Sequence, residues 1–215
     1  MKTISMQPIW LRVRRSVVEM LGDRSGNAAV EFAVIVPLML TMFFGTVELS
    51  NGVAVDRKVT LVARTLSDLT SQSLDKTSDT ELENIFAASS SILSPYSVTP
   101  IDPTISEIYV NKSKVAKIQW SKSATLSMVS GAPKAVLKNS ARHKGDTIII
   151  PEGLQIPDTY LIFSEINYKY VPVIGYVMNK DGVKLDDVSY TRPRQSRCID
   201  YPAPVSPALP CTPAS

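Results

Sequence analysis

Few residues of this 215-residue chain are of the types that carry out catalysis or bind metals. The chain has one histidine, His143, and two cysteines, Cys198 and Cys211, which are too few for the common tetrahedral zinc sites. It contains no phosphate-binding glycine loop and no Gly-x-Ser-x-Gly turn. Ser73 and Lys76 match a Ser-x-x-Lys hydrolase pattern, but chance produces this spacing in a serine-rich chain. We therefore expect a protein that is not an enzyme and that uses no cofactor or metal.

The two cysteines have a second possible chemistry, because they lie close together in a proline-rich segment. A disulfide between Cys198 and Cys211 would close a 14-residue loop. Such a bond forms and persists in an oxidising compartment, so the alternative of two unpaired thiols holds if this segment stays in the cytoplasm. We predict the disulfide on the condition that the C-terminal part of the chain is exported.

The other unusual ionisable group is Glu31, which lies at the start of a long apolar segment. The 16 residues from 32 to 47 are all uncharged, and Glu31 is the only charged residue between 28 and 47. A helix of about 20 residues spans the hydrocarbon core of a bilayer, which is ~30 Å thick. The pattern therefore predicts a transmembrane helix at residues 27–50. An ionisable residue inside such a helix is a candidate functional residue.

The distribution of charge predicts how this helix is oriented. Residues 1–26 carry five basic and two acidic side chains, a net charge of +3, which is also the net charge of the whole chain. Because basic residues stay on the cytoplasmic side, we expect a cytoplasmic N-terminus, an inner-membrane helix and export of the residues beyond 50. The remainder of the chain is neutral, so its charge does not favour binding to nucleic acid.

Three kinds of processing are compatible with this segment. A secretory signal would be cut near residues 52–54, whose small side chains suit a signal peptidase. A signal anchor would not be cut at all. The third possibility rests on Gly26, which ends the basic leader and precedes Glu31 and Phe32 by five and six residues. This arrangement resembles the site of prepilin peptidases, which would cut between Gly26 and Asn27.

The surrounding sequence resembles one family of such precursors. The run at residues 26–40, followed by Gly45, Glu48 and Leu49, looks like the TadE-like segment of the tight-adherence (Tad) pilus system. The resemblance implies a minor pilin or pseudopilin that assists assembly of an adhesion pilus. It implies as partners the inner membrane, a prepilin peptidase, other pilus subunits and the Tad secretion platform.

The resemblance also implies an assembly role for Glu31 and the adjacent Phe32. In pilins, this glutamate is thought to neutralise the N-terminal amine of a neighbouring subunit. The alternative is that the Glu31 side chain only reaches toward the lipid headgroups. The alternative function is a membrane-tethered extracytoplasmic binding module that is never cleaved and never joins a filament.

The exported part is predicted to begin with a continuation of the helix. A stripe of apolar residues steps by four, three, four and three: Val55, Val59, Val62, Leu66 and Leu69. This spacing predicts helix to about Ser71, with the stripe in the core of a domain rather than in a short coiled-coil seam. A capping box at Ser78 and Glu81 then predicts a second helix that stops before Pro95.

Alternating and β-branched runs predict strands at residues 105–110, 115–120, 147–150, 160–170 and 185–190. Residues 121–142 are ambiguous and are expected to be partly helical. The predicted fold class is α+β, with a long N-terminal helix packed on a small antiparallel β-sheet. The predicted regions are a leader at 1–26, a transmembrane helix at 27–50, an exported helical region at 51–94, a β-rich domain at 95–197 and a proline-rich tail at 198–215.

A basic stretch is the last distinctive feature. Between Glu107 and Asp146 the chain has no acidic residue and eight basic ones, which lie at residues 112–144. One interpretation is a face for an anionic surface or an acidic pilus subunit. The other is a solvated edge on which lysines discourage strand pairing.

Overall fold

The computed structural model describes residues 26–172 and 182–202. It has two α-helices, α2 (Asn27–Ser71) and α3 (Asp79–Ser90), and two short 3₁₀ helices, η2 (Ser91–Leu93) and η3 (Glu152–Leu154). Its strands are β1 (Ile101–Val110), β2 (Ala116–Val129), β3 (Ala132–Asn139), β4 (Thr147–Ile148), β5 (Thr159–Tyr170) and β6 (Val183–Thr191). The chain divides between Val47 and Glu48 into two units. The predicted α+β class is confirmed, because a long N-terminal helix precedes an antiparallel six-stranded sheet.

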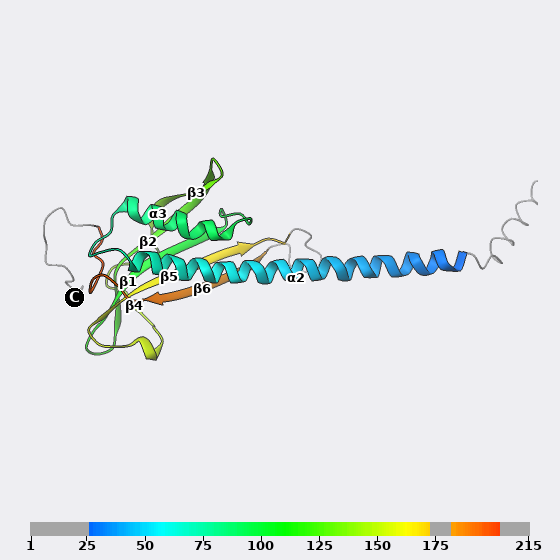
Figure 1. The fold of residues 1–215 in the computed structure, drawn as a ribbon. Coiled ribbons are helices and arrows are strands. Elements are labelled where there is room, and N and C mark those ends of the chain that lie inside the picture. Colours follow the sequence, from blue (N-terminus) through cyan, green and yellow to red (C-terminus); the bar gives the residue numbers. More distant parts are fainter. Residues whose placement is uncertain (1–25, 173–181, 203–215) are drawn as a thin grey trace, which may run out of the picture. The chain divides into compact units, whose positions relative to one another are not determined.

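The sheet has the strand order β3-β2-β1-β5-β6, and the short β4 pairs with β2 beyond this path. All of its pairings are antiparallel. Strand β5 alternates as predicted: Ile162, Ile166 and Tyr168 are at most 4% exposed on one face. Residues 48–71 of α2 and helix α3 cover this face (Figure 1).

The predicted stripe of α2 forms the centre of the main core. Val55, Val59, Val62 and Leu66 are at most 1% exposed and pack with α3 and with the inward residues of the strands. These four residues are therefore domain core, as predicted, while Leu69, the last residue of the stripe, is only partly buried. A buried hydrogen bond of 2.6 Å from the Ser164 hydroxyl to the Ala63 carbonyl also joins β5 to α2.

Helix α3 begins as its sequence predicts. Ser78 is the N-cap residue, and its hydroxyl accepts a hydrogen bond of 3.3 Å from the Glu81 N–H. The Glu81 carboxylate does not complete the capping box, because it accepts hydrogen bonds from the hydroxyls of Ser73 and Thr77 instead. It thereby joins the start of α3 to the connection that follows α2.

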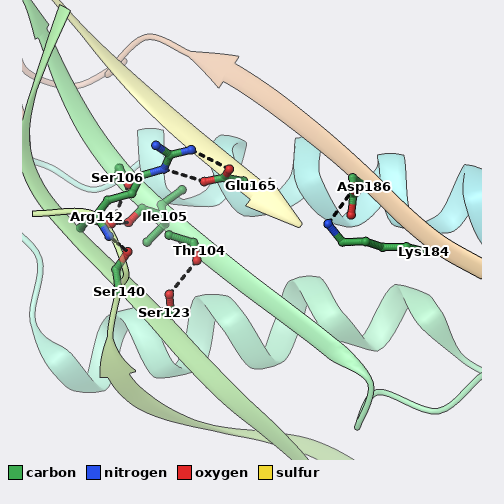
Figure 2. Close-up of polar contacts among 10 residues, drawn as sticks. Thr104, Ile105, Ser106, Ser123, Ser140, Arg142, Glu165, Lys184 and Asp186 are labelled. Atoms are coloured by element: carbon green, nitrogen blue, oxygen red, sulfur yellow. Dashed lines mark hydrogen bonds and ion pairs between the residues drawn. The ribbon is translucent and has the colours of Figure 1, made fainter. Parts of the chain in front are cut away.

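The opposite face of the sheet is covered over only part of its area. A second apolar cluster forms there from Ile108, Val110, Leu161 and Phe163, against the segment of β4 and η3. The rest of this face is mixed, because the half-exposed Val188 pairs with Glu165 and the half-exposed Val136 pairs with Thr125. Figure 2 shows Thr104 bonded to Ser123 and, above the same face, Arg142 bonded to Glu165.

One prediction about the sheet is wrong. Residues 121–142, expected to be partly helical, form the second half of β2 and all of β3, which pair as a hairpin. The turn of this hairpin has two residues with positive φ, Ser130 at 51° and Gly131 at 82°. Such values at both central positions suit the right-handed twist of paired strands, so the local backbone supports a hairpin and not a helix.

Candidate membrane and assembly segment

The N-terminal half of α2 presents an apolar surface that has no partner among the described residues. The large hydrophobic side chains exposed by 40% or more on this part are Val30, Phe32, Val34, Ile35, Leu38, Met39, Leu40, Met42, Phe43, Phe44, Val47, Leu49 and Val53. Exposed apolar area on all sides of a helix is unfavourable in water and favourable in lipid. Among the described residues, this is the one helix long and apolar enough to cross a membrane. The segment therefore fits a membrane anchor.

Pro37 lies inside α2 without ending it. The hydroxyls of Thr41 and Thr46 each donate to the carbonyl four residues earlier, at 2.8 and 2.9 Å. These two bonds give both threonine hydroxyls of the segment an acceptor, as an apolar environment requires.

The residues predicted for cleavage and assembly lie at the beginning of this helix. Gly26 immediately precedes α2, is exposed, and has no atom within 4 Å of the position that a Cβ would occupy. Asn27 is the first residue of α2. Glu31 is exposed and makes no hydrogen bond or ion pair with any residue that the structure describes, and Phe32 is 68% exposed. Glu31 and Phe32 therefore lie exposed within the first two turns of α2, directly after the predicted cut.

The change from exposed to buried along α2 occurs near the division between the two units. Glu48 is 3% exposed, and Val55 is fully buried. From there on, the helix has a polar side and a buried side, as expected for a helix that packs on one sheet face.

A C-terminal segment at residues 192–202, here called the strap, runs back across the end of the domain. Its backbone bonds to residues that follow α2: the Arg194 N–H donates to Ser71, and Asp200 exchanges backbone bonds with Asp75 and Thr77. Arg194 also forms an ion pair with Asp68. The strap therefore closes the end of the domain where α2 stops.

Two side chains from the sheet hold the middle of the strap. The Glu107 carboxylate accepts a bond of 2.6 Å from the Ile199 N–H, and the Trp120 indole donates a bond of 2.6 Å to the Ile199 carbonyl. Glu107 is 1% exposed, and this burial raises the pKa of its carboxyl to about 8. The bond between Glu107 and Ile199 has no local signal in the sequence, because 92 residues separate the two.

The predicted disulfide involves the same segment. Cys198 is 1% exposed and is a disulfide-bonded cysteine. Cys211 lies outside the described residues, so the pair Cys198–Cys211 stays a prediction. Among the described residues, no group of three His, Cys, Asp or Glu side chains could hold a metal ion.

The basic stretch is partly neutralised in the fold. Lys138 pairs with Asp102 at 2.8 Å, and Arg142 pairs with Glu165 through two bonds of 2.6 and 2.7 Å. The second pair raises the pKa of the Arg142 guanidinium, chiefly through its bond to Glu165. Both acids come from other strands, so two of the eight basic residues are neutralised by contacts that the local sequence does not show.

These features define a class of protein: an α+β domain that follows an apolar helix able to anchor it in a membrane. The comparisons with known proteins make the class more specific. Residues 26–66 match the model of the TadE-like protein family, so this part of the chain is similar to that family. The match begins at Gly26 and ends in the buried part of α2. No curated protein and no solved structure matches the chain.

Proposed function

We propose that the protein is a minor pilin or pseudopilin of a Tad-type adhesion pilus. The observation that carries this proposal is that the first half of the TadE-like match at residues 26–66 is an apolar helix exposed on all sides. In this proposal the leader stays in the cytoplasm, the helix lies in the inner membrane and the domain faces the periplasm. The partners are other pilus subunits and the Tad secretion platform.

Processing is the first step of the proposed function. A prepilin peptidase removes residues 1–26 by cutting between Gly26 and Asn27. The exposure of Gly26 and the open space around its Cα support this step, because the peptide bond is accessible without unfolding of the domain. Cleavage makes Asn27 the new N-terminus and Glu31 the fifth residue of the mature chain.

Assembly is the second step, and Glu31 is its proposed determinant. A carboxylate in an apolar setting is stabilised by an opposite charge close to it. The new amine at Asn27 of a neighbouring subunit supplies this charge when two helices lie side by side with a small axial offset. Phe32, which is exposed next to Glu31, adds apolar contact between the helices.

A second candidate function is a membrane-tethered binding module that is neither cleaved nor assembled. It is favoured by the exported domain, whose two apolar cores are built from residues of a single chain. Such a domain can act without a filament.

The mature N-terminus separates the two functions. The protein is isolated from membranes and from sheared pili of the same cells, and its N-terminal peptide is identified by mass spectrometry. The proposal predicts a chain that begins at Asn27. A chain that begins at Met1, or near Val55 after cleavage by a signal peptidase, would overturn it.

A further inference from the structure

A pocket of about 470 Å³ lies beside β2, where the chain leaves β3 and turns back toward β4. Its walls come from β2, from residues 139–144 and from the end of the strap at Tyr201 and Pro202. The volume is within the usual range for sites that take a small molecule. Neither the TadE-like match nor the proposed assembly step involves this pocket.

The charge of the pocket is positive. None of the described residues that line it is acidic. Three of them are basic: Lys122, Arg142 and Lys144. Arg142 is already paired with Glu165. Lys122 and Lys144 have no carboxylate partner among the described residues. Two positive charges therefore remain for an anionic ligand.

The pocket also has an aromatic wall that is held in place. The Tyr201 ring lies 5.4 Å from the Trp120 ring, centroid to centroid, and its hydroxyl donates to Asp79. Lys122 Nζ lies 5.6 Å from the centre of the Tyr201 ring and 3.2 Å from the Asn139 side-chain oxygen. The ring and the cation beside it are thus positioned before any ligand enters.

The remaining lining groups are neutral hydrogen-bonding side chains: Gln119, Ser121, Asn139 and Ser140. Amides and hydroxyls beside an aromatic ring suit the hydroxyl groups and the apolar face of a sugar ring. The two lysines suit a carboxylate on that ring through charge-assisted hydrogen bonds. A bare inorganic anion would use the lysines and leave the aromatic wall without contact.

We propose that this pocket binds an acidic sugar unit, a hexuronic acid or a similar carboxylate-bearing monosaccharide residue. The carboxylate lies between Lys122 and Lys144, and the sugar ring lies against Tyr201. The proposal does not depend on the pilus role, because a tethered module would present the same pocket.

The test uses two probes that differ only at one carbon, methyl β-glucuronide and methyl β-glucoside. Binding to the full chain in detergent micelles is measured by saturation-transfer NMR and titration. The glucuronide should bind at least about tenfold more tightly than the glucoside, the factor that one charge-assisted hydrogen bond provides. Lys144→Gln should weaken glucuronide binding by a similar factor without affecting the fold, because Lys144 is exposed.

Lys134→Gln is the matched control, since it removes the same charge from β3 at a position that does not line the pocket. It should leave the affinity unchanged. Equal binding of the two glycosides, no binding of either, or equal weakening by Lys134→Gln and Lys144→Gln would overturn the proposal. Competition by inorganic phosphate at the same affinity as the glucuronide would also overturn it, because the pocket would then be a simple anion site.

Discussion

The Glu107 carboxylate accepts a hydrogen bond of 2.6 Å from the backbone N–H of Ile199, and both residues are buried. Together with the bond from Trp120 to the Ile199 carbonyl, it satisfies both polar groups of a strap residue that water cannot reach. Buried backbone groups without partners are costly, so these two side chains allow the strap to cross an apolar core. The end of the domain is therefore closed by polar groups on β1 and β2.

This relationship predicts a stability that depends on pH. Burial raises the pKa of Glu107 from 4.5 to about 8, so the folded chain binds this proton more tightly than the unfolded chain does. The stabilisation is complete below pH 4.5 and is lost as the pH rises through 8. Between pH 5 and 8 the free energy of unfolding should fall by about 3 kcal/mol more for the native protein than for Glu107→Gln. Urea unfolding followed by circular dichroism measures this difference, and parallel pH profiles would contradict it.

Trp120→Phe tests the other bond to the strap. The variant keeps an aromatic ring but leaves the buried Ile199 carbonyl without its donor, which should cost about 1–3 kcal/mol of unfolding free energy. Tyr109→Phe is the control, because it removes only the bond to Asp158 at a position that is not buried in the core. Its effect should be below about 1 kcal/mol. Equal losses in the two variants would show that the strap does not depend on Trp120.

Gly26→Leu tests processing. The space around Gly26 is open, so a larger side chain does not disturb the described fold, and any effect arises in recognition by the peptidase. The variant should accumulate as a precursor that retains residues 1–26, while Gly26→Ala, which keeps a small residue, should be cut. Mass spectrometry of the purified chains distinguishes the two forms. Cleavage of Gly26→Leu at the normal level would contradict the proposed cut.

Export of the domain predicts the state of the cysteines. A thiol reagent applied to denatured protein should label Cys198 and Cys211 only after reduction, because the disulfide forms in the periplasm. A reporter that works only in the periplasm should be active when fused after Ser215. Labelling without reduction, together with an inactive reporter, would place the domain in the cytoplasm.

The elements with a strong local pattern could be predicted from the sequence. The helix over 27–71 was predictable because an apolar run is followed directly by a heptad-like stripe. No proline lies between the two. The start of α3 was predictable because the Ser78 cap is a local interaction. Strand β5 was predictable because apolar and polar residues alternate in its second half, where Ile166, Tyr168 and Tyr170 are buried.

The hairpin of β2 and β3 was missed for an equally local reason. Strand β3 contains Pro133, Ala135 and Leu137, which have little preference for strands, and it lies at an edge of the sheet where such residues are tolerated. Strand β1 begins at 101 and not at the predicted 105, and the additional residues include Pro103, which is unfavourable within a sheet. Its pairing with β2 starts only at Thr104, so Pro103 has a partner strand on one side alone.

The residues of the candidate sites also fall into two groups, those with a local sequence signal and those without one. Gly26 and Glu31 were identified because their signal is a spacing within one short segment. Glu107, Trp120 and the pocket beside β2 depend on contacts between distant segments. An isolated glutamate in a strand gives no sign that its carboxyl is buried.

In the proposed function, the apolar helix takes part in pilus assembly and does not serve only as an anchor. Glu31→Leu tests this claim, because it removes the proposed partner of a neighbour's N-terminal amine and leaves the apolar helix intact. If Glu31 only reaches toward headgroups, the substitution should leave insertion unharmed or improved. If it pairs with the amine, that charge loses its partner in an apolar setting, at a cost of several kcal/mol.

The decisive measurement compares, in the same cells, the amount and cleavage of the Glu31→Leu protein with the number of pili seen by electron microscopy. Phe163→Leu, a substitution in the second core of the domain, is the control for general damage to the protein. We predict that Glu31→Leu is present, exported and cut after Gly26, and that the cells lose pili or pilus-dependent attachment. Normal pili and attachment with Glu31→Leu would contradict the account and favour the tethered binding module.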